Sequence, residues 1–142
     1  MPTHTPTPTS TPSPSPTATP TPTVTPTQTP RPADVRVVPS CCQFDPPGND
    51  NLHLNDEYVC LENQGGLAAD MTRWQVKDLA DHTYTFPAFA LLAGARVKLR
   101  TGCGTNTLTD VYWCQGGAVW NNDGDTVLLY DSAGVLVDQY RY

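Results

Sequence analysis

The sequence lacks the features that would place it in a membrane, on a nucleic acid or around a zinc ion. No apolar run approaches the roughly 18 residues that a membrane-spanning helix needs. No CxxC pair occurs among the five cysteines, and the three histidines have no metal-site spacing, so we expect no zinc site. Only eight Lys and Arg residues stand against fourteen Asp and Glu residues, and this acidic balance disfavours nucleic-acid partners.

Catalytic signatures are also missing. No nucleophile motif such as G-x-S-x-G occurs. His53 and His82 each stand beside an acid (Asp56 and Asp81), but no nucleophile accompanies them. We interpret both histidines as solvated turn residues and predict that the chain is not an enzyme.

Proline and threonine dominate the first part of the chain, residues 1–33. Frequent proline fixes the backbone φ angle and removes amide donors, so neither helix nor sheet is expected. We predict an extended, disordered or polyproline II spacer that rises about 3.1 Å per residue where it is polyproline II. Thr and Ser beside Pro suit O-glycosylation, and a plain linker without sugar is the alternative. Met1 is followed directly by this spacer, so we expect any export signal to lie outside this sequence.

The second part, residues 34–142, has the periodicity of short strands separated by Gly, Asn and Asp. The expected strands are 35–38, 57–63, 74–78, 84–86, 96–100, 125–130 and 135–140, with a hairpin turn at 131–134. The expected core residues are Val59, Leu61, Trp74, Val76, Phe86, Val97 and Leu99. No segment has about ten residues of helical periodicity, so we predict an all-β, two-sheet sandwich.

Seven longer motifs in this second part are specific enough to compare with known families. In chain order they are EYVCLEN (57–63), WQVKD (74–78), TYTFP (83–87), L-x-x-G-x-x-V (91–97), TDVYW (109–113), VWNNDGD (119–125) and LLYDSAGVLVD (128–138). This series resembles the lamin tail domain, in the bacterial form in which DPPGNDN (45–51) precedes NDEY. The resemblance covers residues from about 45 to the C-terminus. It implies an immunoglobulin-like sandwich without catalytic residues.

One position departs from the family pattern. Arg73 stands where a small residue, often Gly, commonly precedes the tryptophan, and this puts the local turn in question rather than the fold. Bacterial domains of this family typically accompany extracellular or envelope-associated modules, including nucleases and other hydrolases. The resemblance therefore implies an extracellular or cell-surface location.

The cysteines suit disulfides, as expected for a domain on a stalk outside the cell. Cys103 and Cys114 bracket a loop rich in Gly, Thr and Asn, and a bond between them would contribute about 2–3 kcal/mol. Cys60 points away from the inward face of its strand and is expected to pair with Cys41 or Cys42. One thiol is then left, either free or linking two chains.

Oxygen-bearing side chains gather around the start of the second expected strand. They are Asp45, Asn49, Asp50, Asn51, Asp56 and Glu57. Calcium takes about six to eight oxygen ligands in irregular loops, so this cluster is a candidate calcium site. The spacing is not that of an EF-hand, and Asx-turn hydrogen bonding is the alternative. We expect no other cofactor.

Aromatic side chains cluster near Cys114. Tyr112, Trp113 and Trp120 form a candidate surface for binding a protein or a cell-surface glycan. The alternative is that the two tryptophans cap the end of the sandwich.

We therefore predict a non-catalytic, extracellular or cell-surface interaction or structural module, with the sandwich at 34–142 projected by the spacer at 1–33. One alternative is an accessory domain of a longer secreted hydrolase or nuclease. Another is a self-associating surface protein that uses the spare cysteine or the edge of its last strand.

Overall fold

The computed structural model describes residues 1–15 and 28–142. Residues 1–15 contain no helix or strand and are exposed, in keeping with a proline-rich sequence that has nothing apolar to bury. The predicted spacer also includes residues 16–27, which lie outside the described residues. Within the described ranges, no helix is long and apolar enough to cross a membrane.

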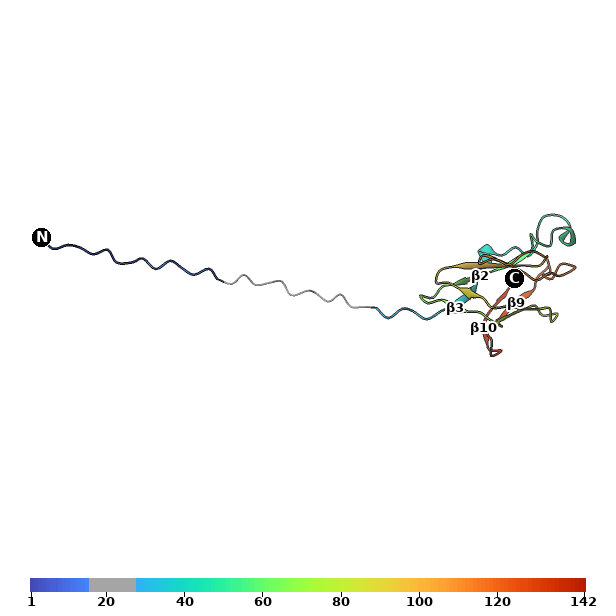
Figure 1. Ribbon diagram of the computed structural model, residues 1–142. Helices are drawn as coiled ribbons and strands as arrows, with labels where there is room; N and C mark the ends of the chain where they lie inside the picture. Colours follow the sequence, from blue (N-terminus) through green and yellow to red (C-terminus); the bar gives the residue numbers. More distant parts are fainter. Residues whose placement is uncertain (16–27) are drawn as a thin grey trace.

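Two four-stranded sheets form the domain, so the predicted all-β, immunoglobulin-like sandwich is confirmed (Figure 1). The first sheet has the order β1 (Val35–Val37), β2 (Tyr58–Asn63), β7 (Arg96–Arg100), β8 (Asp110–Tyr112). The second has the order β10 (Leu136–Arg141), β9 (Thr126–Tyr130), β4 (Gln75–Lys77), β5 (Thr83–Thr85). A separate pair joins β3 (Ala69–Asp70) to β6 (Ala90–Leu91). Two 3-10 turns, η1 (Pro39–Cys41) and η2 (Asp50–Leu52), lie between β1 and β2.

The core fills the space between the sheets because apolar side chains alternate along the strands. Both β2 and β7 point every second side chain inward, and β4 and β9 supply the opposite wall. Val59, Leu61, Val76, Val97, Leu99, Val127 and Leu129 are all 0% exposed, and Phe86 is 1% exposed. Each such side chain contributes about 1.5–3 kcal/mol relative to its exposed state, so this alternating set is the main source of stability.

Trp74 differs from its prediction, because it is only partly buried and packs against the border of the core. Strand β4 begins one residue later, at Gln75, and Trp74 still belongs to a turn in which its N–H donates to the Met71 carbonyl (2.9 Å). Met71 itself is fully buried. Arg73, in the same turn, has φ 65°, the left-handed conformation that Gly adopts at no cost. The residue that departs from the family pattern therefore occupies a position that favours glycine.

Three strands were not predicted from the sequence. Strands β3 and β6 have two residues each, too few for any alternation to be visible. Strand β8 has three residues and pairs with β7 in parallel, in the register Leu99 to Val111. Such a pairing depends on the crossover in residues 101–109 rather than on a local turn, so no short-range signal marks it.

The sandwich has two ends, which we call proximal and distal. At the proximal end the last spacer residues run alongside the turn after β2. There the Gly66 N–H donates to the Arg31 carbonyl (2.9 Å), and the Gln64 N–H donates to the Asp34 carbonyl (2.7 Å). The distal end lies at the other end of the strands and carries the longest loops, 48–56, 101–109 and 113–125. In Figure 1 the N-terminal segment joins on one side, and the loop around residue 50 lies on the other.

Candidate functional site

A buried glutamate holds the distal loops together. The Glu57 side chain lies just before β2 and is 0% exposed. Its Oε1 atom accepts hydrogen bonds from the Thr101 hydroxyl (2.6 Å) and from the backbone N–H groups of Val119 (2.9 Å) and Trp120 (3.1 Å). All three donors reach the same oxygen, and Oε2 is buried without a partner. Because the donors come from the segments around residues 101 and 119–120, the Glu57 carboxylate fixes both segments against its own.

The crossover between β7 and β8 is closed by a disulfide between Cys103 and Cys114, the predicted pair. Both cysteines lie at the distal end, one where the chain leaves β7 and one where it leaves β8. The Cys114 N–H also donates to the Gly102 carbonyl (3.0 Å), and Cys114 has φ 59°. The bond thus joins the start of the crossover to the segment that follows β8.

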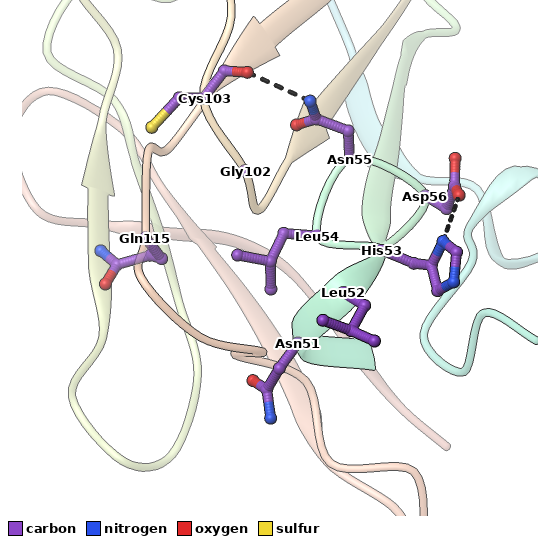
Figure 2. A pocket seen from close by; sticks show the side chains of 9 residues that line it. All are labelled: Asn51, Leu52, His53, Leu54, Asn55, Asp56, Gly102, Cys103 and Gln115. Carbon is purple, nitrogen blue, oxygen red and sulfur yellow. Dashed lines mark hydrogen bonds and ion pairs between the residues drawn. The ribbon is translucent and has the colours of Figure 1, made fainter. Parts of the chain in front are cut away.

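A cavity of about 360 Å³ opens between the first distal loop and this crossover (Figure 2). Its lining residues are Asn51, Leu52, His53, Leu54, Asn55, Asp56, Gly102, Cys103 and Gln115. Asn55 donates from Nδ2 to the Cys103 carbonyl (3.1 Å), and the Gly102 N–H donates to the Leu54 carbonyl (3.0 Å). The two walls are therefore joined to each other by hydrogen bonds.

The second disulfide joins Cys41 to Cys60, so the thiol left over is that of Cys42. Cys60 is 0% exposed on the outer side of its sheet, where η1 covers it. The Cys42 Sγ accepts from the Cys60 N–H (3.2 Å) and donates to the Val38 carbonyl (3.3 Å). Burial raises the pKa of the Cys42 thiol to about 11. These contacts argue against a ready link to a second chain through Cys42.

The oxygens of the candidate calcium site do not converge. Glu57 turns into the core, whereas Asp45 and Asp56 are exposed. Asn51 accepts from the Ala118 N–H (3.0 Å), and Asn49 accepts from the Asn51 N–H (3.1 Å) as the cap of η2. Throughout residues 1–15 and 28–142, no group of three His, Cys, Asp or Glu side chains is placed to hold a metal ion. Asp50 adds no ligand to such a group, and its Oδ1 is buried without a partner.

The predicted aromatic surface is wrong for Trp120, which is 2% exposed. Its ring packs edge-on against Trp113 (6.1 Å between centroids) and against Phe44 (5.8 Å). Trp113 is partly buried and also contacts Tyr84 (6.0 Å). The two tryptophans therefore close the distal end of the core, as in the alternative interpretation. Tyr112 is also only partly exposed, because its ring packs on the Gly104 backbone.

His53 and His82 each pair with a carboxylate close by in the sequence. His53 lies 3.5 Å from Asp56 as an exposed pair on the rim of the cavity. His82 pairs with Asp78 (2.6 Å), not with the neighbouring Asp81. Asp78 is 2% exposed and also accepts from the N–H groups of Ala80 and His82, so it shapes the turn between β4 and β5. Both pairs thus belong to turns.

Sequence reasoning missed the groups that build the distal end. Glu57 was grouped with calcium ligands, although it lies one residue before a strand, where a charged side chain can face inward. Asn55, Gly102 and Gln115 carry no motif. Their positions become informative only once the crossover brings residues 102 and 115 beside residues 51–56.

Comparison with known families gives one match. The family described as Lamin Tail Domain matches residues 30–142, which includes every strand of both sheets. No curated protein matches the chain. The match covers most of the chain, and the sandwich has the immunoglobulin-like fold of that non-catalytic family. The chain therefore belongs to the lamin tail domain family.

Proposed function

We propose that this chain is a non-catalytic extracellular interaction module that uses its distal end to contact a protein or a glycan. The observation that carries the proposal is the position of the spacer. Arg31 and Asp34 dock at the proximal end, so the described part of the spacer leaves the distal loops uncovered. A module attached through its N-terminal segment presents such a surface to its surroundings.

The cysteines support the extracellular part of the proposal. Four of the five cysteines form two disulfides, and such bonds persist mainly in oxidising compartments. Intact-mass measurement after alkylation under denaturing conditions, on protein isolated from its host, tests this point. We expect one alkylated thiol before reduction and five afterwards. Five alkylated thiols without reduction would contradict an extracellular location.

Photo-crosslinking tests the choice of end. Leu52 is 78% exposed at the distal end, and Val135 is 59% exposed in the hairpin between β9 and β10. A photoreactive amino acid placed at residue 52 in the full chain should give a discrete adduct on the native host surface, and one placed at residue 135 should not. Adducts of equal yield from both positions, or only from residue 135, would overturn the proposal.

A further inference from the structure

The distal cavity has the size and rigidity of a small-molecule site. Its volume of about 360 Å³ falls at the small end of the range for ligand pockets, roughly 300–1,000 Å³. The Asn51 amide is fixed by the Ala118 N–H, and the Asn55 amide by the Cys103 carbonyl. Gly102 has to lack a side chain, because a Cβ there would lie 2.3 Å from Asn55 Oδ1. The cavity walls are thus preformed, which lowers the entropic cost of binding.

The polar side chains that line the cavity are neutral amides and the pair formed by His53 and Asp56. Gln115 makes no side-chain hydrogen bond with the residues that the structure describes, so its amide offers both a donor and an acceptor. Asn51 uses its Oδ1 internally and keeps its NH₂ group. His53 lies 3.5 Å from Asp56, and neither Lys nor Arg is among the lining residues.

Apolar surface accompanies these groups. Figure 2 shows the Leu54 side chain pointing toward Gln115 across the cavity, with Leu52 beside it. Leu52 is 78% exposed, an unusual position for a large apolar side chain next to several amides. A ligand that fills the cavity would therefore place carbon against leucine and polar atoms against amides.

The amides, the carboxylate and the leucines of the cavity together favour one chemical class of ligand. An anion would meet Asp56 without a cationic lining residue, and a metal ion would find no group of three ligands among the described residues. A neutral ring with neighbouring hydroxyls matches both parts, because amides donate to and accept from hydroxyls, carboxylates accept from hydroxyls, and leucines cover C–H faces. We infer that the distal cavity binds one neutral pyranose unit of a glycan. The inference rests on the proposed function and names the chemistry of its partner.

Titration of the full chain with neutral methyl glycosides tests the inference. The probes are the methyl glycosides of glucose, galactose, mannose and N-acetylglucosamine, followed by ¹H–¹⁵N correlation spectra. We expect at least one probe to shift the amide signals of Leu54, Gly102 and Gln115 saturably, with millimolar affinity. Gln115→Ala should weaken that binding at least tenfold. Gln139→Ala, on the exposed face of β10, should leave it unchanged.

Two outcomes would overturn the inference. One is the absence of any saturable shift at these amides with all four probes. The other is binding that persists unchanged in Gln115→Ala, in a spectrum that shows an intact fold. If the sugars fail but residue 52 still crosslinks to a surface partner, the glycan inference is wrong while the proposed function stands.

Discussion

The hairpin between β9 and β10 and the distal end of the sandwich are held in different ways. The hairpin turn depends on residues within it, because the Asp131 side chain accepts from the Ala133 and Val135 N–H groups (2.9 Å each). At the distal end, contacts span the chain, and the bond from the Trp120 N–H to Glu57 joins residues 63 positions apart. The hairpin closes by local turn chemistry, whereas the distal end requires a buried carboxylate and a disulfide.

Replacing Glu57, the hydrogen-bond acceptor of the distal loops, should lower the stability most. Glu57→Ala leaves the Thr101 hydroxyl and two buried N–H groups without their acceptor. We expect the free energy of unfolding, measured by chemical denaturation, to fall by about 3–5 kcal/mol. Glu62→Ala, on the same strand, removes only a surface pair with Arg96 and should cost less than about 1 kcal/mol. Equal losses would show that Glu57 has no special role.

Removing the Cys103–Cys114 disulfide should cause the second-largest loss of stability. The variant Cys103→Ala/Cys114→Ala opens a loop with a sequence separation of 11 residues and should lose about 2–3 kcal/mol of unfolding free energy. The spectral changes should be confined to the distal loops. Cys42→Ala, which breaks no disulfide, is the control. An unchanged denaturation midpoint in the double variant would contradict the role assigned to this bond.

A glycine substitution tests the proximal end. In Gly65→Ala the new Cβ would lie 2.1 Å from the Pro32 carbonyl oxygen, so residues 31–34 should be displaced at a cost of about 1–3 kcal/mol. Limited proteolysis should then cut before Val35 more readily. Gly116→Ala has nothing within 4 Å of the new Cβ and should change neither property. Unaltered cleavage in Gly65→Ala would mean that the spacer is not docked there.

The smallest expected effect is an increase in stability. Arg73 holds φ 65° against the preference of a residue with a Cβ, so Arg73→Gly should raise the free energy of unfolding by about 1 kcal/mol. Arg73→Ala keeps the Cβ and should give no gain. If thermal denaturation shows the same increase for both variants, the cause lies in the arginine side chain rather than in the backbone.

The same contrast explains what the sequence could predict. Strands with visible alternation, such as Arg96–Arg100, and the hairpin turn at 131–134 follow from local rules. The alternation of β2 places Cys60 on the outer face of its sheet, so the sequence limited its partner to Cys41 or Cys42. Neither Trp120 nor Glu57 could be placed, because their burial depends on loops that meet only after the β7–β8 crossover forms. Local turn chemistry is visible in the sequence, and long-range polar contacts are not.

Amide hydrogen exchange on the native chain tests most directly whether the distal loops form a rigid surface. The N–H groups of Gly102, Val119 and Trp120 have backbone or carboxylate acceptors within 3.1 Å, and we expect them to exchange as slowly as amides inside β7. The amide of Ser132, in the exposed hairpin turn, provides the fast reference. Exchange of Gly102, Val119 and Trp120 at the rate of Ser132 would contradict the preformed distal end.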